Sequence, residues 1–147
     1  MTETLGPPVG HVHSAALPWV TAGPVGLQVL RVSPDTWVVR NRFQAGFRLP
    51  KHKHTGGVHA YTFSGRWQYA EYGIDYVAGT FIYEPPGSIH TLTVQEDSDI
   101  LFTIQGAFIE FDEQENISGI VDGESTLNAY YALCDASGIP RPEGILR

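Results

Sequence analysis

The segment GFRLPKHKH (residues 46–54) and the segment GTFIYEPPGSIH (residues 79–90) decide the fold and the candidate site. They contain the histidines His52, His54 and His90, which stand at regular spacings from glycine and proline. Side chains on a β-strand point alternately to its two faces, so His52 and His54 share one face while Lys53 points to the other. The first segment therefore predicts two metal ligands on one strand.

The third histidine follows a turn. Residues 85–87 read Pro-Pro-Gly, a pattern that reverses the chain, and a new strand is expected over residues 90–94 beside the first one. Three imidazoles can then meet at one metal ion. His11 and His13 have the same His-x-His spacing, but no second element accompanies them, so they are not assigned to a metal site.

The two segments resemble the two signature motifs of the cupin superfamily, Gly-x5-His-x-His and Gly-x5-Pro-x-Gly-x2-His. The second motif departs at its last position, where Val94 stands in place of the usual asparagine. The resemblance implies a jelly-roll barrel with one divalent metal ion inside. Within cupins, residues 52–62, 65–71 and 84–91 resemble the 2,4'-dihydroxyacetophenone dioxygenase group.

That resemblance implies a non-haem Fe(II)-dependent dioxygenase. Its reaction would cleave a carbon–carbon bond next to the carbonyl of a small aromatic hydroxyketone or diketone, with O2 as the second substrate. Imidazole ligands also suit Zn, Ni and Cu, so the residues alone leave the metal open. Two other functions stay open: a zinc-binding cupin sensor or regulatory module, and a metal-dependent cupin acting on a polar metabolite.

Many cupins place a glutamate as a fourth ligand shortly after the second histidine, and the candidates here are Val58 and His59. Strand parity favours an inward Val58, which turns His59 outward. A β-bulge at residues 55–57 would reset that parity and make His59 a fourth ligand or a partner of one. Without a carboxylate ligand, the ion would keep its full charge and favour an anionic substrate that donates oxygen.

Glu71 is the candidate catalytic residue, because the alternation Trp67, Tyr69, Glu71 brings a carboxylate into an aromatic environment. There it would take the substrate's acidic proton or bond to a ligating imidazole, and the alternative is an ordinary surface glutamate. Glu84 precedes two prolines and is interpreted as a structural residue of the turn. The candidate pocket wall consists of Val58, Trp67, Tyr69, Phe81 and Phe102.

Short β-branched and aromatic segments separated by turn formers predict an all-β protein. These segments are residues 25–32, 36–43, 58–63, 66–72, 79–83, 90–94 and 100–105. We therefore expect a cupin double-stranded β-helix (jelly-roll barrel) with a short C-terminal helix over residues 125–137, capped by Ser125. Residues 1–147 would form a single cupin domain with an irregular N-terminal arm over residues 1–24. Residues 108–123 fit neither a strand nor a helix pattern clearly.

Composition argues against two classes of partner. The 147 residues include 9 basic and 16 acidic side chains, and this net charge of -7 is unsuited to nucleic acid or anionic membranes. The single cysteine, Cys134, allows no internal disulfide, and no segment is apolar over the length of a membrane helix. We therefore expect a cytoplasmic protein. Sheet edges pair readily, so we also expect a homodimer with the Trp19 arm as a candidate contact.

Overall fold

The computed structural model describes residues 6–147, and strands dominate it. A 3-10 turn, η2 (Ser14–Ala16), precedes the first strand, and one helix, α1 (Gly123–Ala136), follows the last. The strands are β1 (Val20–Ala22), β2 (Val25–Val32), β3 (Thr36–Phe43), β4 (Arg48–His54), β5 (Val58–Tyr69), β6 (Tyr76–Val77), β7 (Phe81–Glu84), β8 (Ile89–Gln105), β9 (Phe108–Phe111) and β10 (Ile117–Val121). The predicted all-β architecture with a C-terminal helix is confirmed.

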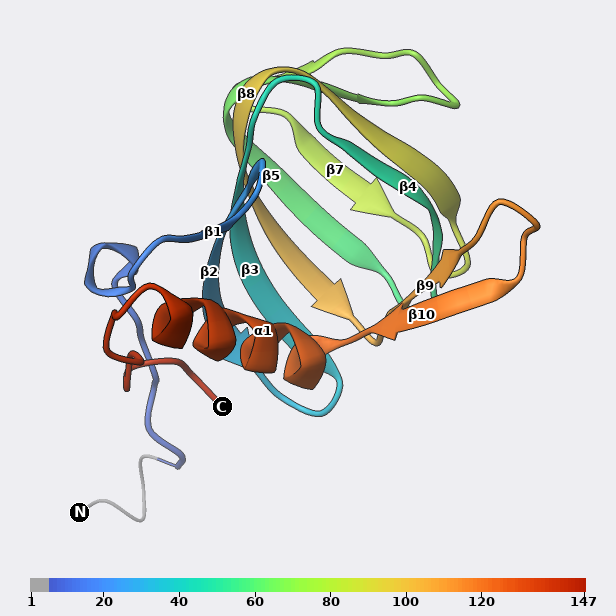
Figure 1. Ribbon diagram of the computed structural model, residues 1–147. Coiled ribbons are helices and arrows are strands. Elements are labelled where there is room, and N and C mark those ends of the chain that lie inside the picture. The colour runs from blue at the N-terminus through green and yellow to red at the C-terminus, as the bar shows by residue number, and fades with distance from the viewer. Residues whose placement is uncertain (1–5) are drawn as a thin grey trace.

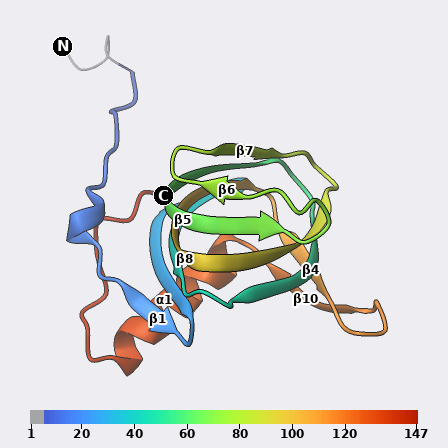
Figure 2. The same ribbon diagram turned by 90° about the horizontal axis from the view of Figure 1, so that it is seen from above.

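The strands form one antiparallel sheet that curls around a shared interior (Figures 1 and 2). Strand β8 joins the two walls of this barrel, because its first part pairs with β4 and its second part pairs with β3. Helix α1 packs against β1, β2 and β3. No helix within residues 6–147 has the length and apolar character needed to cross a membrane.

Two long strands replace four of the short ones that the sequence predicts. β5 runs through Ser64-Gly65 and β8 runs through residues 96–98, and both stretches contain turn-forming residues. The two strands bend together there, with register shifts between Thr62 and Trp67. Gly65 has a φ of 99°, and a Cβ on it would lie 2.3 Å from the carbonyl oxygen of Asp97. The turn formers therefore make a bend within a paired sheet, which local sequence patterns do not distinguish from a chain reversal.

The described part of the predicted arm is more ordered than expected. β1 pairs with β2, so a short strand lies inside the segment interpreted as irregular. Buried Gln28 on β2 donates hydrogen bonds of 2.9 Å to the backbone oxygens of Ser14 and Leu17, which ties the arm to the barrel. The first five residues of the arm lie outside the described residues.

The helix begins earlier than the sequence predicts. Asp122 is its N-cap, and Ser125, the predicted cap, is the third helical residue. The Asp122 carboxylate accepts a hydrogen bond from the Ser125 backbone N–H at 2.8 Å, and the Ser125 hydroxyl accepts one from the Asp122 N–H at 3.0 Å. This reciprocal pair satisfies two backbone donors that a helix start otherwise leaves unpaired.

Substitution Asp122→Ala should lower the free energy of unfolding by about 1 kcal/mol, the usual cost of losing an N-cap side chain. Urea unfolding followed by far-UV circular dichroism measures this change. Glu113→Ala is the matched control, because Glu113 is an exposed carboxylate in the loop between β9 and β10. Equal unfolding midpoints for the two variants would contradict the assigned cap.

Candidate metal centre

Three histidines converge inside the barrel. His52 and His54 point inward from β4, and His90, near the start of β8, is the direct cross-strand partner of His52. Their exposed fractions are only 3%, 4% and 1%. One ring nitrogen from each lies within 4.8 Å of those of the other two. The structure thus brings together the three imidazoles that the sequence singles out.

The protonation state of these rings suits a metal ion. Burial lowers the pKa of His52 and lowers that of His54 to about 4, so both are neutral near pH 7. Nδ1 of His52 lies 2.8 Å from the backbone oxygen of Pro50, which can only accept, so Nδ1 carries the proton and Nε2 keeps its lone pair. The buried Nδ1 of His54 has no hydrogen-bond partner among the described residues. Three buried imidazoles, of which His52 and His54 are neutral, fit a divalent transition metal.

Glu84 lies beside these histidines, contrary to its interpretation as a turn residue. Its Oε1 is 2.7 Å from Nε2 of His90, and its Oε2 is 3.7 Å from Nε2 of His54. The contact with His90 is close, but it lies off the direction of a hydrogen bond. Tyr69 donates a hydrogen bond of 2.6 Å from its hydroxyl to Oε1. The carboxylate is therefore fixed at the edge of the three-histidine cluster.

The charge of Glu84 follows from its neighbours. Burial alone would raise the pKa of this carboxyl, but contacts with His90, His54 and Tyr69 outweigh burial and hold the pKa below its usual value. Burial and the adjacent carboxylate raise the pKa of Tyr69, so its phenol stays protonated and donates. A bound cation would favour the ionised carboxylate further. The site thus contains one anionic group that could face a metal ion.

The sequence contains a signal for Glu84. Residues 81–84 alternate between exposed and buried side chains, so Phe81 and Tyr83 face outward while Glu84 faces inward. Glu84 is also the cross-strand partner of Val58, the inward residue at the position where many cupins have glutamate. The carboxylate therefore reaches the interior from β7, beside the position predicted for it on β5.

A cavity of about 250 Å³ adjoins the cluster. Its polar lining is small: His52, His54, Glu84, Asn41 and Thr126. Its remaining lining is apolar and includes Trp37, Phe43, Phe47, Leu92, Phe102 and Phe108. Such a lining suits a small substrate with an apolar body.

The predicted pocket wall is partly corrected. Val58 and Phe102 line the cavity, whereas Trp67 and Tyr69 are buried in the adjacent core and do not line it. Phe81 is 64% exposed, so the structure contradicts its place in the wall. The reason is the alternation along β7, which turns Phe81 to the outer face.

His59 and Glu71 lie outside the cavity lining. His59 is exposed on the outer face of β5, where its ring stacks on those of Phe81 and Tyr83, because the chain keeps the parity that places Val58 inside. The alternative of His59 as a fourth ligand is therefore wrong. Glu71 is exposed, and its carboxylate accepts a hydrogen bond of 2.9 Å from the backbone N–H of Thr91.

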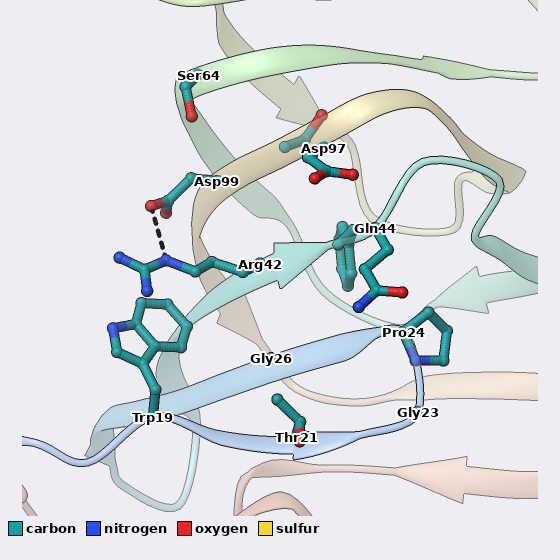
Figure 3. A pocket seen from close by; sticks show the side chains of 12 residues that line it. Trp19, Thr21, Gly23, Pro24, Gly26, Arg42, Gln44, Ser64, Asp97 and Asp99 are labelled. Carbon is teal, nitrogen blue, oxygen red and sulfur yellow. Dashed lines mark hydrogen bonds and ion pairs between the residues drawn. The ribbon is translucent and has the colours of Figure 1, made fainter.

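A larger hollow of about 440 Å³ lies on the outside of the barrel and contains no histidine (Figure 3). There the ring of Trp19 lies 4.1 Å from the guanidinium carbon of Arg42. Asp99 forms ion pairs with Arg40 at 2.8 Å and with Arg42 at 3.4 Å. Trp19 therefore packs on its own barrel. Arg42 and Asp99 are paired with each other, and the Asp97 carboxylate accepts a hydrogen bond of 2.8 Å from the backbone N–H of Ala45.

Comparison with known proteins adds a family and a fold. A model of the ChrR cupin-like domain matches residues 9–109. A protein of unknown function with a cupin-like fold from Ralstonia eutropha JMP134 is 31% identical, covers 87% of this chain and 86% of its own, and has a TM-score of 0.81. An RmlC-like cupin from the same organism is 25% identical over 95% of each chain, with a TM-score of 0.85. These likenesses confirm the predicted cupin fold.

An acetylacetone dioxygenase from Acinetobacter johnsonii shares the fold at 17% identity, with a TM-score of 0.73 over 87% of this chain and 93% of its own. None of these three solved structures is described as a 2,4'-dihydroxyacetophenone dioxygenase, so that finer resemblance stays a prediction. The search of curated proteins found no match.

Proposed function

This chain belongs to the ChrR cupin-like domain family, and from that premise we propose that its three-histidine centre binds Fe(II) in a dioxygenase. The proposed reaction cleaves a carbon–carbon bond next to the carbonyl of a small hydroxyketone or diketone. The observation that carries the proposal is the joining of three buried imidazoles, a fixed carboxylate and an apolar cavity in one place.

His52, His54 and His90 would hold the metal. Bound Fe(II) would supply binding of the substrate oxygens and activation of O2, chemistry that zinc does not offer because Zn²⁺ has no redox states to use. Copper and nickel also accept imidazole ligands, and iron is preferred here because of the dioxygenase resemblance. The acetylacetone dioxygenase among the solved structures supports the same reaction class through its fold alone.

The local charge suits an enolate. Three neutral imidazoles, one carboxylate and a divalent ion carry a net charge of +1. When Glu84 takes the substrate's proton its carboxyl becomes neutral, so the enolate faces a charge of +2 and compensates half of it. The sequence alone suggests an uncompensated double charge, and Glu84 reduces it. We propose that Oε2 of Glu84 takes the acidic proton of the substrate, because Oε1 is held by Tyr69 and Oε2 is not.

The cavity limits the substrate. At about 250 Å³ it lies below the roughly 300–1,000 Å³ of typical ligand pockets. A diketone or a ketone with one aromatic ring is of suitable size, and the aromatic side chains of the wall favour an apolar body. The same wall offers few partners to a polar metabolite, so that alternative has less support.

Fe(II)-reconstituted protein should consume O2 when it is mixed with members of a panel of hydroxyacetophenones and β-diketones. Reconstitution is anaerobic, uptake is followed with an oxygen electrode, and carboxylic acid products are identified by mass spectrometry. Zinc-reconstituted protein is the matched control and should show no uptake. Absence of uptake across the panel, in protein that holds iron stoichiometrically, would count against the dioxygenase.

The zinc-binding sensor is the second candidate, because three imidazoles are also a common zinc ligand set. The metal content of protein purified from cells separates the two candidates. The homodimer stays a prediction, and its proposed Trp19 contact competes with the packing of Trp19 on Arg42.

A further inference from the structure

A row of aromatic rings leads from the metal centre to the surface. The ring of Tyr69 lies 4.5 Å from that of His90, centroid to centroid, and 6.1 Å from that of Tyr72. Tyr69 is 3% exposed, whereas Tyr72 is 61% exposed. The backbone N–H groups of Tyr72 and Gly73 both donate to the carbonyl oxygen of Tyr69. This turn keeps the side chain of Tyr72 beside that of Tyr69.

A second branch widens the row. Trp67 is fully buried, with its ring 5.1 Å from that of Tyr69 and 5.0 Å from that of Tyr76. Tyr69 also lies 5.5 Å from Tyr76. Tyrosine and tryptophan are the side chains most readily oxidised by one electron, and rings in contact exchange electrons quickly. All members of this cluster beyond His90 are therefore of the redox-active kind.

Glu84 provides the proton acceptor that oxidation of a tyrosine requires. A tyrosine that loses an electron becomes a strong acid and must release its phenolic proton. The Tyr69 hydroxyl donates to Oε1 of Glu84 at 2.6 Å, so a proton acceptor is already in place. The buried ring that contacts His90 can therefore lose an electron and a proton in one step, without any movement of the chain.

We propose that Tyr69 and Tyr72 form a path that carries oxidising equivalents from the metal centre to the protein surface when oxygen chemistry occurs without substrate. The proposal rests on the iron centre of the proposed function, but it does not depend on the identity of the organic substrate. Its benefit is protection of the buried ligands His52, His54 and His90 from oxidation.

Hydrogen peroxide is the oxidant in the proposed sequence of electron transfers. If iron is bound, peroxide would take one electron from Fe(II), leaving Fe(III), and one from Tyr69, and with two protons it would yield two waters. Both of these protons come from solvent, because the proton of Tyr69 stays on Glu84. Tyr72 then reduces the Tyr69 radical and releases its own proton to water, while Glu84 returns a proton to Tyr69. A soluble thiol would finally reduce the Tyr72 radical, and a second electron from thiol would return Fe(III) to Fe(II).

The test exposes Fe(II)-loaded protein, without organic substrate, to one equivalent of peroxide in the presence of a nitrone spin trap. Peptide mapping by mass spectrometry then locates the trapped radical. We expect the adduct on Tyr72 and its absence from Tyr83, which is a matched internal control. Tyr83 is 55% exposed, similar to Tyr72, but it contacts His59 on the outer face instead of the row.

The variant Tyr69→Phe keeps the ring but removes the phenol, and it should lose the Tyr72 adduct and gain oxidation of the ligand histidines. Equal adducts on Tyr72 and Tyr83, an unchanged Tyr72 adduct in Tyr69→Phe, or no adduct in iron-loaded wild type would each overturn the path. A Tyr72 adduct in a protein that consumes no O2 with any ketone would retain the path and reject the proposed substrate class.

A second variant covers the case in which Tyr69→Phe fails to fold or to hold iron. Tyr72→Phe changes only an exposed side chain at the end of the row. Freeze-quench electron paramagnetic resonance should then show a tyrosyl radical that lasts longer than in wild type, because its most exposed exit is lost and only the partly buried Tyr76 remains. An equal lifetime in both proteins would overturn the proposal.

Discussion

His90→Ala should abolish stoichiometric metal binding. His90 supplies one of three imidazoles whose nitrogens lie within 4.8 Å of one another, and its loss removes one of the three proposed ligands. The expected loss in affinity exceeds about 100-fold, because removal of a mere hydrogen-bond partner of a metal ligand already costs roughly 10–100-fold. His52→Ala and His54→Ala should behave in the same way. Metal content after dialysis, measured by plasma mass spectrometry, gives the result.

His59→Ala is the matched control for these variants. It removes a histidine from the strand that follows the ligand strand, but from its outer face, and metal content should stay at the wild-type level. Circular dichroism checks that each variant folds. A His59 variant depleted of metal, or a His90 variant that still binds one equivalent, would contradict the three-histidine centre.

The three histidines follow from the sequence because strand alternation is a local property. His52 and His54 share a face wherever β4 lies, and the Pro-Pro-Gly turn before His90 allows little freedom in where the next strand starts. The family resemblance then fixes the barrel that brings the two segments together. Strand alternation and the family resemblance agree at these residues. Together they are sufficient to predict that His52, His54 and His90 form one cluster.

The position of Glu84 could not be derived in the same way. Its inward direction depends on the register of β7 against β5, where it pairs with Val58, and register is a tertiary property. The two prolines that follow it indicate a turn, a pattern that does not show the direction of the carboxylate. Alternation along β7 places Phe81 and Tyr83 on one face and Glu84 on the other, and the pairing with β5 decides which face points inward.

The bends in β5 and β8 also could not be predicted from local sequence. Gly65 and the residues 96–98 have the composition of turns, but in the folded chain they bend β5 and β8 together at one corner of the barrel. Only the partner strand distinguishes such a bend from a hairpin, because the partner supplies the hydrogen bonds that keep the chain extended. The Ser98 hydroxyl, which accepts from the Arg66 N–H at 3.1 Å, is one of these contacts.

Glu84→Gln should lower kcat for O2 consumption by about 10²–10⁴-fold, the usual contribution of a positioned proton-transfer group. Glutamine has nearly the same shape, and its carbonyl oxygen can still accept the hydrogen bond from Tyr69, so the fold and the three ligands are kept. It cannot take a proton from the substrate at neutral pH. Iron content should therefore stay stoichiometric while turnover falls.

Glu71→Gln provides the matched comparison, since it alters the carboxylate that the sequence predicts as catalytic. That carboxylate accepts a hydrogen bond from the Thr91 backbone and does not line the cavity, so its exchange should leave kcat within a small factor of wild type. The two variants carry the same chemical change at different distances from the cavity. Slow turnover in Glu71→Gln together with normal turnover in Glu84→Gln would return the proton transfer to Glu71. Slow turnover in Glu84→Gln alone would assign it to the carboxylate that Tyr69 holds against the histidines.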